Sequence, residues 1–235
     1  MASSKPDAPL YDEIADAYAA RVDAAPYNAL YERPAMLALL PPIAGRDVLD
    51  AGCGSGWYSE QFLARGARVT AIDASPVIAA YARARVGARA SVHVADLGRP
   101  LAFASDSRFD LIVAPLVLHY LPAWEPTLRE FHRLLRPGGH LAFSTHHPGS
   151  EAERLGTRAY FETELVEESW KDVGQVRFYR RPLSAIFDAL AAAGFLTERI
   201  VEPRPTAALR DAAPDAYERL LQRPAFLLVR ARRVP

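Results

Sequence analysis

The sequence of 235 residues predicts an α/β fold in which a mostly parallel sheet carries helices on both faces. Short, almost continuously apolar segments alternate with segments of helical periodicity, and such segments are typical of strands buried on both faces. Glycine, proline or a capping residue repeatedly marks the change from one kind of segment to the other. A glycine-rich stretch, DAGCGSG at residues 50–56, follows the first of these strands, where open sheets of this kind place a ligand.

The expected elements follow in order along the chain. Two tyrosines and several apolar residues at helical spacing predict a helix near residues 11–22, and a second helix runs up to the stop signal Pro41-Pro42. Ser75-Pro76, a capping residue before a first-turn proline, begins the helix after the second strand. A helix over about 124–135 ends at the turn RPGG, residues 136–139. Five strands are expected up to this point, at 47–52, 67–73, 90–96, 109–116 and 140–146.

The regular alternation stops after His147. Residues 148–180 are polar and irregular but carry several aromatic side chains, and we expect a lid, because a loop of this length is often functional. A helix at 183–193 and two strands at 195–201 and 225–231 end the chain, and we expect these strands to pair at one edge of the sheet. The prediction is one domain with four parts: a helical cap (1–42), a cofactor-binding core (43–147), a lid or substrate insertion (148–180), and a C-terminal helix with edge strands (181–235).

Composition argues against several classes of protein. Lys and Arg number 28 and Asp and Glu number 28, so no net charge attracts nucleic acid or an anionic membrane. The single cysteine, Cys53, excludes an internal disulfide and fits a reducing compartment. The N-terminal residues lack an apolar signal core, and no apolar run approaches the length of a membrane span. We therefore expect a cytoplasmic protein without a membrane or nucleic-acid partner, and no metal site.

The glycine stretch raises the question of which ligand it binds. A dinucleotide fingerprint reads G-x-G-x-x-G, but Trp57 stands here in place of the third glycine, which disfavours the close contact that a pyrophosphate needs. Asp73 ends the next strand, where a carboxylate can accept hydrogen bonds from ribose hydroxyls. Asp96 ends the third strand, where it can accept one from an adenine amino group. A nicotinamide oxidoreductase thus remains as the less favoured alternative.

Several segments together resemble the successive motifs of the class I S-adenosylmethionine-dependent methyltransferases, most of all the branch that acts on small molecules. These segments are VLDAGCGSG, VTAIDAS, VADL, FDLIVAPLVLHYL and LLRPGGHLAFST, and they cover about residues 47–146. The resemblance implies a Rossmann-like three-layer sandwich with a seven-stranded sheet whose last strand is antiparallel. It also implies S-adenosylmethionine as cofactor and a small molecule as acceptor, methylated at oxygen or nitrogen.

The same resemblance suggests which residues contact the cofactor. Gly52 and Gly54 would lie against its methionine part, Asp73 would hold the ribose, and Asp96 with Leu97 would flank the adenine. Asp50 would supply an acid near the methionine amino group, or else hold the loop in a purely structural role. The N-terminal YDEIADAY looks like a helix that folds over the cofactor, with core packing of its tyrosines as the alternative. The full set of candidates is Tyr11, Tyr18, Asp50, Gly52, Cys53, Gly54, Asp73, Ala74, Asp96, Leu97 and Pro115.

Methyl transfer from a sulfonium is an in-line displacement that chiefly needs alignment, although a hydroxyl or ammonium acceptor also benefits from a general base. Histidine suits that role near neutral pH. His119 follows the fourth strand and His146-His147 follow the fifth, so we expect them to face the cleft. His119 and His147 are the leading candidates, because relatives often carry histidine there. The alternative for each is a hydrogen-bonded residue that shapes the cleft.

The lid supplies candidates for the acceptor site. Tyr160, Trp170 and Tyr179 could enclose an aromatic ring or a cationic amine, and Arg181 could bind a carboxylate unless it is merely solvated. Two further alternatives stay open for the whole chain. One is a nucleic-acid methyltransferase, disfavoured by the neutral charge balance and by Ala114-Pro115-Leu116 in place of an acidic Asp-Pro-Pro-aromatic turn. The other is a cofactor-binding scaffold without catalysis.

Overall fold

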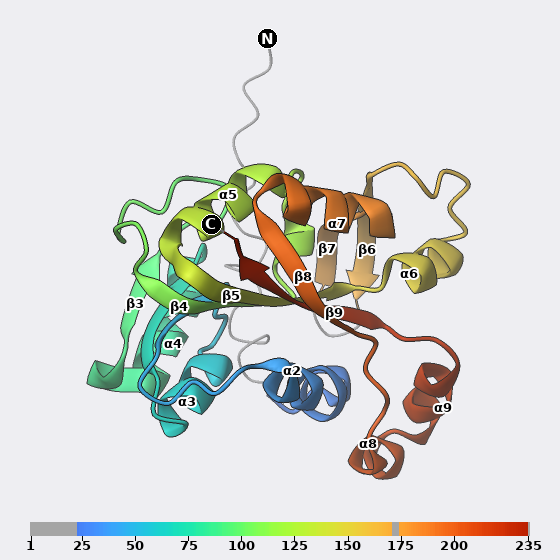
Figure 1. Ribbon diagram of the computed structural model, residues 1–235. Helices are drawn as coiled ribbons and strands as arrows, with labels where there is room; N and C mark the ends of the chain where they lie inside the picture. The colour runs from blue at the N-terminus through green and yellow to red at the C-terminus, as the bar shows by residue number, and fades with distance from the viewer. Residues whose placement is uncertain (1–22, 171–173, 235) are drawn as a thin grey trace.

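The computed structural model describes residues 23–170 and 174–234. A seven-stranded sheet crosses the middle of the molecule in the order β3-β2-β1-β4-β5-β9-β8 (Figure 1). The strands from β3 to β5 pair in parallel, and β9 is antiparallel to both β5 and β8. This confirms the predicted mostly parallel sheet with an antiparallel last strand. The bounds are β1 (Asp47–Ala51), β2 (Arg68–Asp73), β3 (Ser91–Val94), β4 (Phe109–Pro115), β5 (Leu135–His146), β8 (Phe195–Val201) and β9 (Phe226–Arg233).

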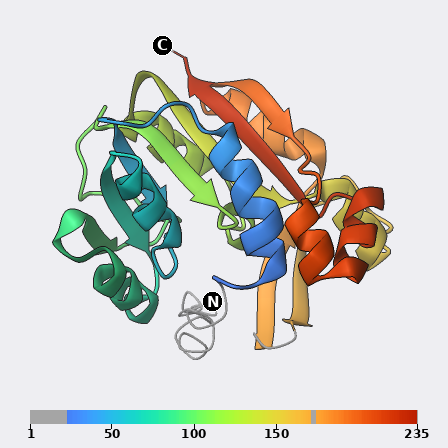
Figure 2. The same ribbon diagram turned by 90° about the horizontal axis from the view of Figure 1, so that it is seen from below.

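Helices cover both faces of the sheet. α5 and α7 lie on one face, α2 and α3 lie on the other, and α8 and α9 lie beside α2 (Figures 1 and 2). Within the described part of the chain no helix is both long enough and apolar enough to cross a membrane. The helices and turns are η1 (Asn28–Glu32), α2 (Arg33–Leu39), α3 (Trp57–Ala64), α4 (Pro76–Val86), η2 (Gly87–Arg89), η3 (Leu118–Tyr120), α5 (Glu125–Leu134), α6 (Pro148–Leu155), α7 (Leu183–Ala192), α8 (Ala207–Ala212) and α9 (Pro214–Gln222).

Local signals in the sequence explain where several helices begin and end. The Ser75 hydroxyl accepts a hydrogen bond from the Ile78 N–H at 3.1 Å, which caps α4 just before Pro76. α2 ends at Leu39, ahead of the two prolines that predicted its end. The helix predicted near residues 11–22 lies outside the described residues.

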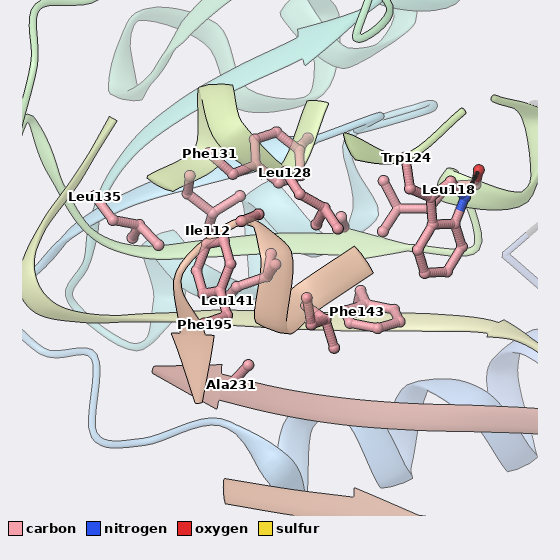
Figure 3. Packing of buried hydrophobic residues seen from close by; sticks show 14 of the residues in the cluster. Ile112, Leu118, Trp124, Leu128, Phe131, Leu135, Leu141, Phe143, Phe195 and Ala231 are labelled. Atoms are coloured by element: carbon pink, nitrogen blue, oxygen red, sulfur yellow. Dashed lines mark hydrogen bonds between the residues drawn. The ribbon is translucent and has the colours of Figure 1, made fainter. Parts of the chain in front are cut away.

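Two apolar clusters hold the layers together. Along β1 and β4 successive side chains point to opposite faces, so that Leu49 and Ile112 join one cluster while Val48 and Leu111 join the other. Figure 3 shows the first cluster, between the sheet and α5 and α7. Trp124 is the largest side chain in it, and its indole N–H donates to the carbonyl of Leu118 at 2.7 Å. Burial on both faces explains why these strands read as apolar runs.

The turn predicted at RPGG is part of an irregular β5. Phe109 pairs with Leu135 and Leu111 pairs with His140, so residues 136–139 bulge out of the ladder. Gly139 is needed there, since a Cβ would lie 2.9 Å from the Arg136 carbonyl oxygen. The expected strand start at residue 140 was therefore five residues late, because the bulge is long and its sequence is that of a turn.

The prediction of an irregular segment over 148–180 was wrong. The segment contains α6 and a hairpin of two antiparallel strands, β6 (Glu164–Trp170) and β7 (Gly174–Arg180). One face of the hairpin buries Val166, Val176 and Phe178 in a small third cluster, against Tyr120 and Leu155. The other face is largely polar, which hid the strands in the sequence.

Candidate functional site

A pocket of about 710 Å³ lies at the carboxyl ends of β1, β2 and β4, where the strand order reverses. That volume is in the range of small-molecule sites in proteins. One wall comes from the glycine loop and the ends of β2 and β3, a second from η1 and α2, and a third from the segment after β4 together with the β6–β7 hairpin.

The glycine loop is shaped by two close contacts. Gly52 has φ +75°, and a Cβ there would lie 2.5 Å from a methyl carbon of Val117, in the segment after β4. Gly56 has φ +85°, and a Cβ there would lie 3.0 Å from the Cα of Ala82 in α4. Both residues must adopt a left-handed conformation that glycine tolerates. Gly52 therefore lets two pocket walls meet, whereas Gly56 is required by the contact with α4.

Asp73 ties the glycine loop to the second strand. Its carboxylate accepts the Gly54 N–H at 2.9 Å through Oδ2 and the Ser75 N–H at 3.0 Å through Oδ1. It also lines the pocket. The structure brings this carboxylate together with most of the other cofactor candidates from the sequence, namely Gly52, Cys53, Gly54, Ala74, Asp96, Leu97 and Pro115.

Asp96 and Cys53 lie on the same wall in different settings. The Asp96 carboxylate accepts the Gly98 N–H at 2.8 Å and lies 3.5 Å from the Arg99 guanidinium, so it is partly engaged at the rim. Cys53 is buried, and burial raises the pKa of its thiol well above the usual value. A neutral thiol is a poor nucleophile, so Cys53 serves as a small filler of the wall.

Asp50 does not line the pocket, contrary to the cofactor contact expected for it. Its side chain is fully buried, and the Ser59 hydroxyl of α3 donates to its Oδ2 at 2.6 Å. Its Oδ1 has no hydrogen-bond partner among the described residues. Burial raises the pKa of Asp50 to about 7. Asp50 therefore has the purely structural role that was its alternative in the sequence analysis, because α3 covers the face of β1 from which its side chain projects.

Glu32 and Arg33 are pocket residues that the sequence reasoning missed. Glu32 is 1% exposed and accepts two hydrogen bonds, from the Tyr58 hydroxyl and the Ser144 hydroxyl, each at 2.7 Å. Burial raises the pKa of its carboxyl group. The only sequence signal was a pair of opposite charges inside an otherwise apolar helix, directly before Pro34.

The Arg33 guanidinium stands over the Trp57 ring at 4.2 Å and donates to Asp23 at 3.1 and 3.2 Å. It is 5% exposed and lies on the pocket wall beside the glycine loop. A buried guanidinium of this kind is a ready partner for a carboxylate.

Leu116, on the pocket wall, has an unusual backbone. Its φ is +49°, a left-handed value that is strained for a residue with a Cβ. Its N–H is held by Ser144, at 3.1 Å from the carbonyl oxygen and 3.0 Å from the hydroxyl. Since Ser144 also donates to Glu32, one set of hydrogen bonds joins η1, β5 and the end of β4.

The three histidines do not line the pocket, so the expectation that they face the cleft was wrong. His119 is 2% exposed, stacks on the His146 ring at 4.3 Å and lies 4.2 Å from the Tyr120 ring. Neither ring nitrogen of His119 has a hydrogen-bond partner among the described residues, and burial lowers its pKa well below the usual value. η3 turns His119 inward against Phe178 of the hairpin, whereas Tyr120 faces the pocket.

His146 and His147 lie on the far side of the same hairpin. The His146 side chain is 14% exposed and packs against Phe178, with ring centroids 4.6 Å apart, and this partial burial lowers its pKa. His147 caps α6, since its Nδ1 accepts the Ser150 N–H at 3.2 Å, and its Nε2 lies 2.8 Å from Glu202. Both residues therefore have structural surroundings, which was the alternative left open for them.

Of the lid candidates, Tyr179 lines the pocket and Tyr160 does not. The Tyr160 hydroxyl accepts the Leu183 N–H at 3.3 Å. Arg181 is buried over the Trp124 ring and donates to the carbonyls of Leu121 and Pro122, at 2.7 and 3.2 Å, so it is not placed to bind an acceptor carboxylate. Tyr11, Tyr18 and the side chain of Trp170 lie outside the described residues.

Other hairpin residues take part in the wall instead. They come from the face of the hairpin opposite the buried cluster, apart from Val176, and they are Leu165, Glu167, Gln175, Val176 and Arg177. Glu167 and Arg177 form an ion pair at 2.8 Å, with each side chain 55% exposed. The hairpin side of the pocket thus combines aromatic and apolar groups with one exposed ion pair.

Comparison with known proteins agrees with this geometry. The family model "Methyltransferase domain" matches residues 49–143. A protein of Haemophilus influenzae described as uncharacterized is 29% identical over 230 residues, which is 88% of this chain and 89% of that protein. A malonyl-[acyl-carrier protein] O-methyltransferase of Pectobacterium atrosepticum is 38% identical over 118 residues, half of this chain and 46% of that protein. The chain thus aligns with less than half the length of that curated methyltransferase.

A solved structure matches most of this chain. The crystal structure of an S-adenosylmethionine-dependent methyltransferase from Mesorhizobium loti is 33% identical, covers 90% of this chain and all of the other, and superposes with a TM-score of 0.76. The nicotinamide alternative is set aside by this match and by the glycine spacing. With the motifs, the strand order and a whole methyltransferase aligned at this identity, the chain belongs to the S-adenosylmethionine-dependent methyltransferases.

Proposed function

We propose that this methyltransferase acts on a small-molecule acceptor and methylates it at oxygen or nitrogen. The observation that carries the proposal is the pocket itself. About 710 Å³ is bounded on one side by the glycine loop and on the other by the hairpin, so cofactor and acceptor share one space of small-molecule size. The neutral charge balance supports the further proposal that nucleic acid is not the acceptor.

The residues on the cofactor side fit S-adenosylmethionine. Gly52 and Gly54 line the pocket in a loop without the third fingerprint glycine, which suits a ligand that has no pyrophosphate. Asp73 offers carboxylate oxygens for the ribose hydroxyls, and Asp96 with Leu97 offers a polar and an apolar contact for the adenine. The Arg33 guanidinium suits the methionine carboxylate. When bound, the cofactor supplies a methyl group that its sulfonium already activates.

On the acceptor side the chain aligns and shields the reactants. Tyr120, Leu121, Leu165 and Tyr179 form a surface on which an aromatic or aliphatic acceptor can pack. We propose residues 148–180 as the lid over this half of the pocket. We also propose residues 1–42 as an N-terminal helical cap over the cofactor. No histidine reaches the pocket from the described residues, so the rate enhancement is assigned mainly to orientation and exclusion of water.

Methyl-labelled cofactor and a metabolite extract test the proposal, with the labelled product identified by mass. The acceptor panel includes free and carrier-bound carboxylic acids, because one relative is named a malonyl-[acyl-carrier protein] O-methyltransferase. We expect a labelled small molecule with the native enzyme and none with Asp73→Ala. Asp211→Ala, on exposed α8, is the matched control that should retain activity. Label incorporated only into RNA, DNA or protein side chains, and into no free or carrier-bound acid, would contradict the proposal.

A further inference from the structure

We propose that Glu32 is the receptor for the α-ammonium group of the cofactor's methionine. The inference deepens the proposed function and rests on it, since it requires that the pocket holds the cofactor. It assigns the acidic group beside the methionine part to Glu32, in a helical segment that precedes the sheet, and not to Asp50 in the glycine motif. Glu32 and Arg33, both on the pocket wall, then carry charges opposite to those of the ammonium and carboxylate groups on the methionine α-carbon.

Glu32 lies in surroundings that disfavour a carboxylate without a charged partner. Its side chain lies on the pocket wall, yet the residue is only 1% exposed. A carboxylate withdrawn from water to this extent is strongly disfavoured unless a cation or several hydrogen-bond donors compensate it. The two donors present, the hydroxyls of Tyr58 and Ser144, are neutral, and each binds a different oxygen.

The described residues place no cation in direct contact with this carboxylate. Within residues 23–170 and 174–234 no ion pair to Glu32 is found. The neighbouring Arg33 guanidinium instead donates to Asp23 and lies over Trp57. A carboxylate has about four lone-pair directions, and the two hydroxyls use two of them. Glu32 therefore retains acceptor capacity for a cationic donor that enters the pocket.

The acceptor capacity of Glu32 fits the ammonium group of S-adenosylmethionine. S-adenosylmethionine carries two positive groups, but its sulfonium has no N–H or O–H to donate, whereas its ammonium has three N–H donors. Asp50 cannot serve in its place, because it lies under the loop and bonds to Ser59. Among the carboxylates of the described pocket wall, Asp73 and Asp96 lie at the ends of β2 and β3, and Glu167 pairs with Arg177. Glu32 is the wall carboxylate that lies next to Arg33 and contacts Tyr58 in the first turn after the glycine loop.

The test measures Kd by calorimetry for two ligands that differ in one group. S-adenosylhomocysteine has the α-amino group, and the adenosyl thioether of 4-mercaptobutyrate lacks it. The native protein should bind the amine-bearing ligand about tenfold to a hundredfold more tightly, the range for a hydrogen bond between charged groups. Glu32→Gln should lose this preference, and its Kd for the deaminated ligand should stay within about twofold of the native value.

Two further variants keep the test decisive. Glu153→Gln makes the same chemical change on exposed α6, where Glu153 pairs with Arg223, and should retain the full amine preference. Glu32→Asp keeps the negative charge but withdraws the carboxylate by one methylene group, so it should reduce the preference for the amine-bearing ligand. It also serves if Glu32→Gln does not fold, which circular dichroism would reveal.

The outcomes separate this inference from the proposed function. Equal weakening of both ligands by Glu32→Gln would mean that Glu32 only supports the fold, and no change in either would mean that it faces the acceptor. Either result overturns the inference while cofactor binding stands. A native protein that does not bind S-adenosylhomocysteine would instead overturn the proposed function, and the inference with it.

Discussion

Replacing Gly52 by alanine should disrupt the pocket more severely than replacing Gly56, the other loop glycine with a close neighbour. Gly52 has φ +75°, and its added Cβ would lie 2.5, 2.8 and 3.2 Å from three carbons of Val117. Contacts below 3.0 Å force one of the two chain segments to move. Val117 cannot easily yield, because it follows the strained Leu116 and belongs to the segment that leaves β4.

The magnitude follows from a matched position. Gly45 has φ +72°, almost the value at Gly52, but an added Cβ there has nothing within 4 Å. Gly45→Ala therefore carries only the left-handed backbone strain, about 1–2 kcal/mol. Gly52→Ala adds an overpacking contribution of about 1–3 kcal/mol, for a total loss of about 2–5 kcal/mol in the free energy of unfolding.

Urea unfolding and titration with S-adenosylhomocysteine separate the two contributions. Gly45→Ala should lower stability but leave the Kd unchanged, whereas Gly52→Ala should lower stability further and raise the Kd at least about tenfold, since it displaces both walls of the site. Adding Val117→Gly, which removes all three contacting carbons, should recover part of the lost stability and affinity. Equal losses of stability in the two alanine variants, or an unchanged Kd for Gly52→Ala, would refute the steric reasoning.

Three further predictions concern buried ionisable groups. Burial raises the pKa of Asp50 from 3.8 to about 7, so between pH 4 and 7 the folded state holds a proton that the unfolded state has lost. The free energy of unfolding should therefore fall across this window by a few kcal/mol. Asp50→Asn should flatten this dependence on pH, as measured by urea unfolding. Asp47 behaves in the opposite way, because the hydrogen bond from Arg68 holds its pKa well below the usual range. Asp47→Asn should therefore cost about 1–2 kcal/mol at pH 7, after allowance for its exposed arginine partners, and progressively less as the pH falls below about 4. An equal loss at pH 7 and at pH 2 would contradict this. His119→Ala should lower the melting temperature through loss of packing, yet leave the Kd for S-adenosylhomocysteine and the shape of the pH–rate profile unchanged, because His119 does not line the pocket; loss of an ionisation from that profile would restore it as a general base.

The positions of the central strands could be predicted because the sheet imposes a simple pattern. β1 and β4 are buried on both faces, so nearly every residue from Val48 to Ala51 and from Leu111 to Ala114 is apolar. The cofactor candidates followed from the same regularity. Asp73 and Asp96 come at or just after the ends of parallel strands, and those ends meet at one edge of the sheet. Position along the chain was therefore enough to bring these residues together.

Position along the chain was not enough for the histidines and for Asp50. His119 follows β4 as expected, but η3 rotates its ring inward while the next residue, Tyr120, faces the pocket. In β1, Asp50 points toward α3, which covers it. A strand end predicts the neighbourhood of a residue, whereas the direction of its side chain depends on the turn that follows and on the helix packed above.

The second pocket wall lay beyond sequence reasoning for a different reason. Glu32 belongs to a helical segment that precedes the sheet. It reaches the site only because this segment packs against parts of the chain that are far from it in the sequence. Its partner Ser144 is 112 residues away and is itself the hydrogen-bond partner of Leu116. Such a contact has no local pattern, since each residue alone reads as an ordinary member of a helix or a strand.

The two sides of the pocket differ in how they are supported, which explains why the cofactor could be read from the sequence and the acceptor could not. The cofactor side is built on strands whose side chains fill the two main clusters of the core, so changing it disturbs the whole fold. The hairpin on the acceptor side instead rests on a separate small cluster formed by Val166, Val176 and Phe178. Residues such as Leu165 and Tyr179, on the other face of that hairpin, can change without altering either main cluster. The wall that decides which acceptor fits is therefore the part of the site least constrained by the fold, and its chemistry has to be read from the side chains themselves.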